Sequence, residues 1–401
     1  MPNTLTWSRM DRRTWLLQSS LAAAGLVLSP GNSIFSQDSA KPSKQLIARQ
    51  EMPFNAEPPL DRLVDAWITP WELFFVRSHG AVPQIDLGAF RLSIEGLVEK
   101  PQSLTIAELR ERFPLTATTA TLTCAGNRRD EFSAEKPIAG VQWNVGAIGH
   151  AQWAGVKLSE VLKFVGVKSG ATHVWLEGRD EIVDTATSTK SPFGGSIPME
   201  KALADSPIAP GALLATHMND RPLTAEHGAP LRLVVPGYIG ARSVKWLHKL
   251  VVSEQPSPNR FIARDYKLLY EGTDDEIRST GPILQYALNS AITTPKPGAT
   301  ISGNRVTVRG YALAAGEPGR QIAKVEVSGD GGQTWQDAQF TGPRRDFSWV
   351  TWGASVAVSG EKPTLVVRAT DNAGNTQPER AKWNTKGYMN NGWHRVTIAR
   401  G

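Results

Sequence analysis

The chain has 401 residues, with 44 Lys and Arg against 38 Asp and Glu, which gives a formal net charge of +6. At roughly 100–200 residues per domain, this length predicts two or three domains. The single cysteine excludes an intramolecular disulfide, a CxxC redox pair, a cysteine zinc cluster and a CxxCH haem attachment. No run of Lys and Arg is interleaved with aromatic residues, so we expect no binding to nucleic acid.

Two adjacent arginines, Arg12 and Arg13, precede a short apolar run at 15–28. A span of the bilayer needs ~20 apolar residues, which this run does not reach. A basic segment before a weak apolar segment is typical of an export signal, and the paired arginines are similar to the twin-arginine pattern. We therefore expect residues 1–40 to be a twin-arginine signal, the mature protein to be periplasmic, and the mature chain to contain no membrane span.

The segment 41–59 is polar and contains proline, which predicts a linker or an arm. Between residues 60 and 291, two short helices are expected, from Ile106 to Phe113 and from Leu158 to Val165. Short β-rich runs lie among them, at 90–96, 231–237 and 244–253. Regular βαβ alternation is missing from the sequence, so we predict an α+β body and not a doubly wound sheet.

The character of the sequence changes near residue 292, where a Pro- and Gly-rich break precedes short strand-like runs that continue to residue 401. In the run AKVEVS, alternation predicts Ala323, Val325 and Val327 on one face and the charged residues between them on the other. The segment 330–332 supplies a hairpin turn. About a hundred residues of this kind predict an immunoglobulin-like sandwich over 292–401.

The lone Cys124 lies in the string TLTCAGNRRDEF. A single cysteine is often a small buried apolar residue. Here Gly126 permits a tight turn, and Arg128 and Arg129 place two cations close to the cysteine in the chain. Cations stabilise a thiolate, and a soft thiolate suits a thiophilic transition metal. Histidines at HxH or HExxH spacing do not occur, which disfavours a metal site made of histidine alone.

The string TCAGNRR resembles the cysteine motif of the sulfite oxidase family of molybdopterin enzymes, in which this cysteine binds molybdenum. Three more stretches resemble family segments in the family's order: FFVRSHGAVP at 74–83, HMNDRPLTAEHGAPLRLVVPGYIGARSVKWL at 217–247, and RDYK at 264–267. The resemblance is to the bacterial, haem-free, periplasmic sulfite dehydrogenase type. It implies a mixed α/β molybdopterin-binding domain over 60–291, followed by an immunoglobulin-like dimerisation domain over 292–401.

The resemblance also implies roles for individual residues. It makes Cys124 the molybdenum ligand. It places around the Mo-molybdopterin cofactor the residues Phe74, Phe75, Val76, Arg77, Ser78, Asp180, His227, Arg232, Ser243, Val244 and Lys245. It places around the substrate, in catalytic positions, the residues Arg77, Arg129, Trp143, Tyr266 and Lys386. Lys386 departs from the family pattern, because animal enzymes have Arg there and a lysine is only a point charge.

The activity that follows from the resemblance is molybdenum-dependent oxidation of sulfite to sulfate, by a homodimer that passes its electrons to an external c-type cytochrome. Two other hypotheses stay open on the sequence. The first is another molybdenum oxidoreductase with the same fold, such as a sulfoxide reductase. The second belongs to a different class, an exported immunoglobulin-like binding protein that carries no cofactor.

Overall fold

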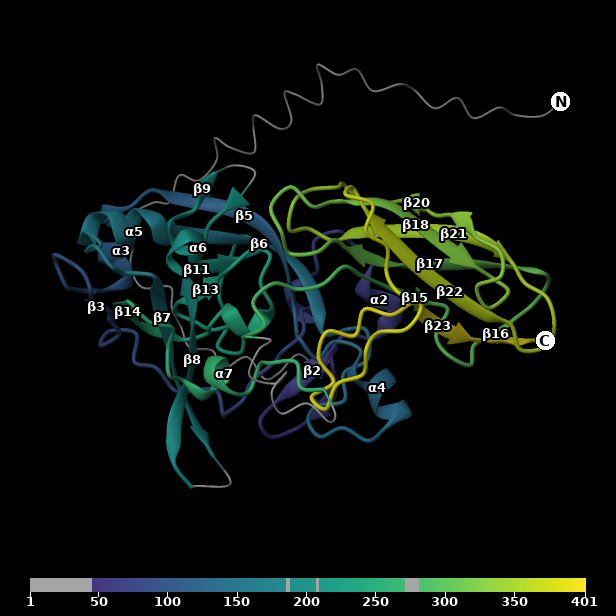
Figure 1. Cartoon of the computed structure of the whole chain (residues 1–401), viewed down its shortest axis with the longest axis horizontal. Coiled ribbons are helices and arrows are strands. Elements are labelled where there is room, and N and C mark those ends of the chain that lie inside the picture. The colour runs from purple at the N-terminus through teal and green to yellow at the C-terminus, as the bar shows by residue number, and fades with distance from the viewer. Residues whose placement is uncertain (1–44, 185–187, 207–208, 271–280) are drawn as a thin grey trace, which may run out of the picture. The chain divides into compact units, whose positions relative to one another are not determined.

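The structure is a computed structural model that describes residues 45–184, 188–206, 209–270 and 281–401, all within one compact unit (Figure 1). The export signal expected at residues 1–40 lies outside the described residues. Among the helices in the described part of the chain, none combines the length and the apolar character that a membrane span requires.

Two five-stranded sheets form the first domain. One sheet has the order β12-β11-β6-β5, with β13 paired to β11, and the other has the order β4-β3-β14-β7-β8. The strands of the first sheet are β5 (Leu115–Thr123), β6 (Ile148–Lys157), β11 (Leu213–Met218), β12 (Arg221–Pro222) and β13 (Arg232–Val234). Those of the second are β3 (Leu92–Gly96), β4 (Gln102–Leu104), β7 (His173–Val183), β8 (Lys190–Pro198) and β14 (Leu247–Ser253).

The second sheet is mixed, because β14 pairs with β3 in parallel and with β7 antiparallel. The three predicted β-rich runs contain β3, β13 and β14. A further short pair joins β9 (Asp205–Ser206) to β10 (Ala209–Pro210). The predicted α+β class of this domain is confirmed.

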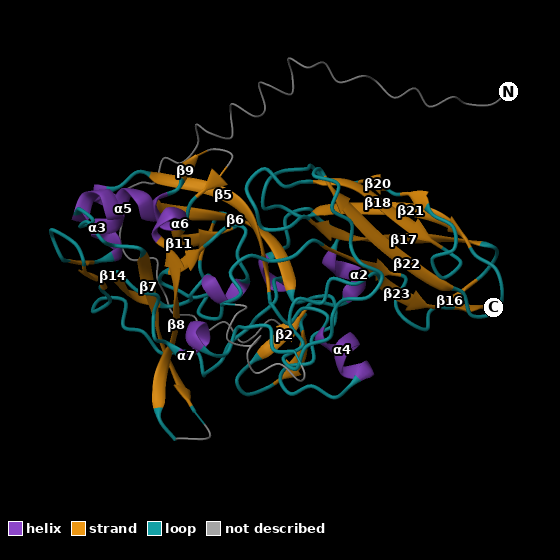
Figure 2. Cartoon of the chain, viewed as in Figure 1, coloured by secondary structure: helices purple, strands orange, loops and turns teal. Residues whose placement is uncertain are grey.

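Helices are few and short among the described residues (Figure 2). The α-helices are α2 (Leu60–Leu63), α3 (Ile106–Arg112), α4 (Arg129–Glu135), α5 (Leu158–Val165), α6 (Met199–Leu203) and α7 (Arg260–Ala263). Two 3-10 turns are η1 (Trp71–Leu73) and η2 (Gly240–Arg242).

The two predicted helices form for local reasons. In α5 the apolar residues Leu158, Val161, Leu162 and Val165 recur at helical spacing and are fully buried, and Gly166 ends the helix at a positive φ of 70°. The observed bounds of α5 equal the predicted ones.

Helix α3 begins with a capping box, in which the Thr105 side chain accepts from the Glu108 amide and the Glu108 carboxylate accepts from the Thr105 amide. The prediction carried this helix one residue too far. Phe113 adopts an extended conformation (φ −126°) as the C-cap, because its ring turns back into the core that α3 covers.

The second domain is a sandwich of two four-stranded antiparallel sheets, with the orders β15-β17-β21-β20 and β19-β18-β22-β23. The first contains β15 (Asn289–Thr294), β17 (Arg305–Leu313), β20 (Gln339–Phe340) and β21 (Val350–Ala357). The second contains β18 (Ile322–Ser328), β19 (Gln336–Asp337), β22 (Thr364–Asp371) and β23 (His394–Thr397). A parallel pair, β16 (Thr300–Ile301) with β24 (Ala399–Arg400), flanks them. The predicted all-β second domain is confirmed.

One predicted core position in the sandwich is wrong. Ala323 is exposed, and Ile322 lies in the sandwich core with Val325 and Val327. The register of β18 against β22 shifts between Ile322 and Lys324. This bulge inserts one residue and reverses the alternation before Val325, which a strict period of two does not anticipate.

The segment expected as a linker or arm contains a two-stranded antiparallel hairpin of β1 (Ile47–Gln50) and β2 (Asn55–Glu57). We call these residues, 47–57, the arm hairpin. Its first strand is exposed and its second is fully buried. The domain boundary expected between residues 291 and 292 falls inside β15, which pairs with β17.

The two domains share part of one core. Tyr311 and Trp349 of the sandwich are fully buried within the main apolar cluster of the first domain. The Tyr311 hydroxyl donates to the carbonyl of Val145 (2.9 Å) and accepts from the side chain of Asn127 (2.9 Å). The sandwich therefore supports the loops that follow β5.

Candidate active site

Cys124 follows directly after β5 and is 8% exposed. Its Sγ accepts a hydrogen bond from the amide of Gly126 at 3.4 Å. A Cβ at position 126 would lie 2.7 Å from a terminal guanidinium nitrogen of Arg129, so glycine lets the Arg129 guanidinium pack closely over the turn after the cysteine. The turn thereby fixes the sulfur against the wall of a cavity.

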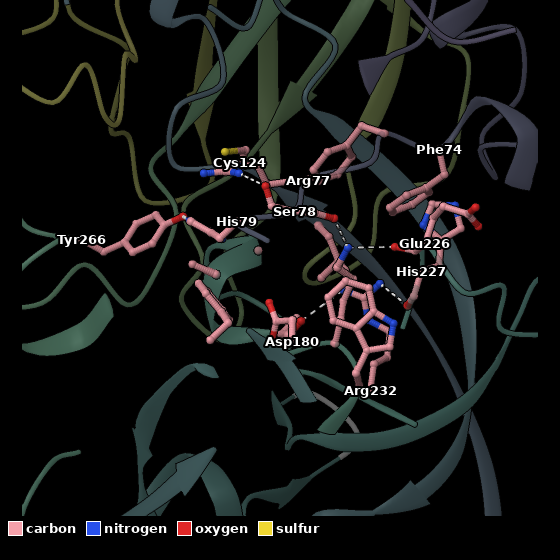
Figure 3. A pocket seen from close by; sticks show the side chains of 18 residues that line it. Phe74, Arg77, Ser78, His79, Cys124, Asp180, Glu226, His227, Arg232 and Tyr266 are labelled. Atoms are coloured by element: carbon pink, nitrogen blue, oxygen red, sulfur yellow. Dashed lines mark hydrogen bonds between the residues drawn. The ribbon is translucent and has the colours of Figure 1, made fainter. Parts of the chain in front are cut away.

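The cavity contains about 660 Å³ of space that atoms do not fill, part of it open to solvent. Eleven of the residues named from the sequence line it: Phe74, Phe75, Arg77, Ser78, Cys124, Asp180, His227, Arg232, Ser243, Lys245 and Tyr266. They come from segments spread over almost two hundred positions of the sequence. Figure 3 shows Cys124 and Arg77 together at one side of the cavity, apart from Asp180 and Arg232.

Two cations, Arg232 and Lys245, line another side of the cavity. Arg232, 6% exposed, donates from Nη1 to the His227 carbonyl (3.0 Å) and from Nη2 to the Ser243 carbonyl (3.2 Å). Its Nε has no hydrogen-bond partner among the described residues. Lys245 Nζ donates to the Ser78 hydroxyl and to the Glu226 carbonyl, both at 2.8 Å. Neither cation makes an ion pair with a carboxylate in the part of the chain that the structure describes.

Burial changes the proton affinity of this cluster. It lowers the pKa of Arg232 to about 9, and burial together with the charge of Arg232 lowers the pKa of Lys245 to about 7. Burial raises the pKa of Asp180, whose Oδ1 has no hydrogen-bond partner within the described ranges. The charges of Asp180 and Glu226 offset the effect of burial on Lys245 only in part, and within the described residues neither cation has an ion-pair partner, so this side of the cavity is suited to an anionic group such as a phosphate.

His227 lines the cavity beside Phe74. Its ring meets Phe74 edge to face, with centroids 5.6 Å apart. Burial lowers the pKa of His227 to about 3, with a smaller effect of Arg232 in the same direction. The imidazole is therefore neutral at physiological pH; one ring nitrogen is hydrogen-bonded to the backbone of Trp71, which leaves the other as an acceptor for a ligand's ring edge.

The side of the cavity that contains Cys124 also contains Arg77 and Tyr266, two residues of the predicted substrate pocket. The Arg77 guanidinium donates to the Ser78 carbonyl and to Oδ1 of Asn55 (3.1 Å). The Tyr266 hydroxyl lies 2.9 Å from Nε2 of His79. The arginine and the phenol on this side of the cavity provide a positive charge and a hydrogen-bond donor for a small oxyanion.

The other predicted residues do not line this cavity. Arg129 donates from Nη1 to the Val141 carbonyl (2.9 Å) and from Nε to the Lys386 carbonyl (3.1 Å). Lys386 thus meets Arg129 through its backbone, and its side chain is partly exposed. Trp143 is fully buried behind Phe75, and its Nε1 has no partner among the described atoms.

Val76 and Val244 are buried backbone partners. Val76 exchanges two hydrogen bonds with Ala56 of the arm hairpin, at 3.0 and 2.9 Å. The Val244 carbonyl accepts from the Leu233 amide at 2.8 Å. The structure thus brings together eleven of the predicted residues at one cavity, and places five, Val76, Arg129, Trp143, Val244 and Lys386, around it.

Arg128 does not act beside Cys124, although the sequence places it there. It adopts a left-handed conformation (φ 67°) and its side chain is fully buried toward the sandwich. Its guanidinium pairs with Glu131 (2.6 Å) and donates to Asn289 Oδ1 (2.7 Å) and the Gly392 carbonyl (2.8 Å). Neighbours in sequence diverge because the positive φ turns the side chain of Arg128 away from that of Arg129.

Sequence reasoning missed His79 and Tyr388. His79 lines the cavity and stacks on Phe193, with ring centroids 4.5 Å apart. Tyr388 stacks on Tyr266 (5.2 Å, 14°), and the Arg129 guanidinium lies 5.1 Å from the Tyr388 ring centroid. His79 lies within the string FFVRSHGAVP that carries the resemblance, and Tyr388 lies two residues after the predicted Lys386, and these positions are the signal that could have found them.

The donor set fits a molybdopterin. No cluster of three or more His, Cys, Asp or Glu that could hold a metal occurs among the described residues, so a metal at Cys124 needs ligands that a cofactor brings. The unpaired cations Arg232 and Lys245 suit the phosphate, and Asp180 and His227 suit the ring edges of a pterin. The orphaned atoms Arg232 Nε and Asp180 Oδ1 are the donor and acceptor that such a group would satisfy.

Comparisons with known proteins agree with this geometry. Residues 79–261 match the family model "Oxidoreductase molybdopterin binding domain", and residues 281–401 match "Mo-co oxidoreductase dimerisation domain". The chain is 41% identical to sulfite oxidase of Gallus gallus over 87% of this chain and 77% of the relative. It is 37% identical to sulfite oxidase of Arabidopsis thaliana over 92% of this chain and 98% of the relative.

A solved structure, the sulfane dehydrogenase SoxCD from Paracoccus pantotrophus, superposes with a TM-score of 0.73 at 27% identity. The match covers 92% of this chain and 93% of that chain. The order of the two domains, the cavity at the single cysteine and these similarities lead to one conclusion. The chain belongs to the sulfite oxidase family of molybdopterin-binding oxidoreductases.

Proposed function

We propose that the protein oxidises sulfite to sulfate with a Mo-molybdopterin cofactor whose metal is bound by Cys124. The observation that carries the proposal is one cavity that holds the only thiol of the chain beside Arg77 and, on another side, the cations Arg232 and Lys245, neither of which makes an ion pair within the described residues. The first feature suits a metal facing an oxyanion, and the second suits the phosphate of the cofactor. The relatives named sulfite oxidase support sulfite as the substrate.

The balanced reaction converts sulfite and water to sulfate, two protons and two electrons. When bound, the cofactor supplies the two-electron redox change and the oxygen-transfer chemistry. Arg77 binds and orients the oxyanion through its fixed charge, and the Tyr266 hydroxyl donates a hydrogen bond to it. The aromatic wall of Phe75, His79 and Tyr266 limits the water around these groups, which strengthens both interactions.

We propose that the two electrons leave to a separate c-type cytochrome. The single cysteine leaves no CxxCH string in the chain, so a c-type haem has to be on another protein. We further propose a homodimer built through the sandwich, supported by the match of residues 281–401 to the dimerisation-domain model. Periplasmic location after twin-arginine export is also a proposal, supported by Arg12 and Arg13 before the apolar run.

The first test is composition. Protein purified from a molybdenum-competent host should contain about one molybdenum and one pterin per chain. A preparation from such a host that binds neither would contradict the proposal and favour the exported binding protein without a cofactor.

The second test is activity. Sulfite should reduce added cytochrome c, and a reduced dye should not drive the reduction of methionine sulfoxide. The opposite pattern would assign the protein to the sulfoxide reductases with the same fold. For location, cell fractionation should find the protein in the periplasm, and the double variant Arg12→Lys and Arg13→Lys should retain it in the cytoplasm.

A further inference from the structure

We infer that Asn55, on the arm hairpin, is a positioning residue that holds Arg77 in the substrate pocket while leaving its positive charge available to an anion. The inference deepens the proposed function and rests on it for the identity of the anion. Neither the family model for the molybdopterin-binding domain, which matches from residue 79, nor the sequence motifs include Asn55.

Asn55 is fully buried, and its side-chain oxygen faces the active site. Oδ1 accepts two hydrogen bonds, from Arg77 Nη1 at 3.1 Å and from the Ser78 amide at 2.9 Å. The adjacent bridge between Ala56 and Val76 fixes the two backbones side by side. Asn55 therefore restrains both the guanidinium of Arg77 and the backbone that carries it.

The other end of the amide fixes its orientation. Nδ2 donates to the Pro53 carbonyl at 2.8 Å and to Gln50 Oε1 at 3.1 Å. With Nδ2 facing these two oxygens, Oδ1 has to face Arg77 and Ser78. All four hydrogen-bonding positions of the Asn55 side chain are used, so the amide cannot flip without losing them.

The group on Asn55 that accepts from Arg77 is an uncharged amide, so it holds the guanidinium without neutralising its charge. Within the described residues Arg77 makes no ion pair, and its two bonded acceptors are an amide oxygen and a backbone carbonyl. A carboxylate at position 55 would neutralise the guanidinium before the substrate arrives. An amide provides the same acceptor atom in the same place and leaves the full charge of Arg77 for an oxyanion.

A second residue of the same strand shows that β2 supports the site as a unit. Glu57 is fully buried, and its carboxylate accepts from the amides of Asn144 (3.1 Å) and Gly146 (3.0 Å). These amides lie one and three residues after Trp143, another residue of the predicted substrate pocket. The strand β2 thus holds two loops that are far apart in sequence, one through Asn55 and the other through Glu57.

The test uses the holoenzyme with the variants Asn55→Ala and Asn55→Asp, and sulfate as the probe anion. In Asn55→Ala we expect the sulfite KM and the sulfate Kd of the molybdenum-loaded enzyme to rise by about 10- to 100-fold, as for loss of a hydrogen bond to a charged group. The kcat at saturating sulfite should fall by less than the KM rises. Asn55→Asp should raise both constants as well, because it keeps the acceptor atoms and neutralises Arg77.

The variant Met52→Ala is the matched control. It truncates an exposed side chain in the turn of the arm hairpin and leaves all four hydrogen bonds of the Asn55 side chain in place, so both constants should stay within about twofold of wild type. If the role of Asn55 were purely structural, Asn55→Ala would lower the melting temperature and the molybdenum content. The sulfite KM and the sulfate Kd of the molybdenum-loaded fraction would stay unchanged. That result in Asn55→Ala, or a wild-type sulfate Kd in Asn55→Asp, would overturn the inference.

A crystal structure of Asn55→Ala separates this inference from the proposed function. We expect the Arg77 guanidinium to leave its wild-type position whatever the substrate is. An unmoved Arg77 would contradict the inference even in an active sulfite oxidase. A displaced Arg77 in a protein that does not oxidise sulfite would support the positioning role and refute the proposed substrate.

Discussion

The hydroxyl of Tyr266 and Nε2 of His79 lie 2.9 Å apart on the wall of the cavity that contains Cys124. Burial, reinforced by the charge of Arg77, lowers the pKa of His79 well below its ordinary value. Burial raises the pKa of Tyr266 above its ordinary value. Both groups are therefore neutral between pH 6 and 9, and the phenol remains a hydrogen-bond donor throughout that range.

The Tyr266→Phe variant should lower kcat/KM for sulfite by about 100-fold, the effect of removing one donor to a developing oxyanion. Because neither Tyr266 nor His79 titrates between pH 6 and 9, kcat/KM of the variant should depend on pH as in the wild type, with lower values throughout. Tyr238→Phe removes a buried hydroxyl outside the cavity lining and serves as the control. A change in the shape of the profile in Tyr266→Phe would show that the pair does ionise in this range.

Replacement of Cys124 by serine should abolish sulfite oxidation and leave the fold intact. Serine is almost isosteric, and the cysteine is surrounded by a pre-formed turn, so the melting temperature should change by only a few degrees. A hard hydroxyl is a poor substitute for a soft thiolate ligand. X-ray absorption at the molybdenum edge should show the loss of one sulfur neighbour per metal, and an unchanged sulfur count or full activity would refute the assignment of Cys124 as the ligand.

The pKa of Lys245 predicts a pH-dependent stability in protein that lacks the cofactor. Its value of about 7 lies below the ordinary 10.5, so between these values the unfolded state binds the additional proton. Stability should therefore rise with pH above 7, by at most about 1.4 kcal/mol per pH unit. Denaturant unfolding of the cofactor-free protein at pH 7.0 and 8.5 measures this slope.

The Lys245→Met variant supplies the comparison, because it has no ammonium group to bury and should lose that part of the slope. The holoenzyme should also lack it, since the phosphate of the cofactor would hold Lys245 in its charged form. Equal slopes in wild type and Lys245→Met would show that Lys245 is not the group responsible.

Arg128 should contribute to stability and not to substrate binding. Arg128→Met removes the ion pair with Glu131 and the hydrogen bonds to Asn289 and Gly392 of the second domain. Glu131 is 33% exposed and keeps a hydrogen bond with Asn390, so we expect a loss of about 1.5–3 kcal/mol in the free energy of unfolding, typical of lost hydrogen bonds to a charged group.

Arg395→Met is the control for Arg128→Met. It breaks a more exposed pair with Glu379 in the sandwich and should cost less than about 1 kcal/mol. The sulfite KM of the molybdenum-loaded fraction should stay near wild type in both variants. A large rise of the KM in Arg128→Met alone would place this arginine in the substrate site after all.

Local signals in the sequence determined much of the architecture. The capping box of Thr105 and Glu108 and the apolar period of α5 act within one element, so α3 and α5 could be predicted to within one residue. The short strand-like runs that continue to residue 401 predicted the sandwich for the same reason. The single cysteine and the ordered family strings predicted a set of site residues, and the structure brings eleven of them to one cavity.

Tertiary packing decided what sequence patterns do not encode, namely where each side chain points. Arg128 and Arg129 are neighbours in sequence, yet a positive φ directs Arg128 to the sandwich while Arg129 stays near Cys124. His79 is an unremarkable histidine until folding places Tyr266, 187 positions away, against its ring. Asn55 lies in a polar segment with the composition of a linker, and only the pairing of Ala56 with Val76 brings it to Arg77. Periodicity and caps report interactions within a few residues along the chain, whereas these contacts arise from long-range packing.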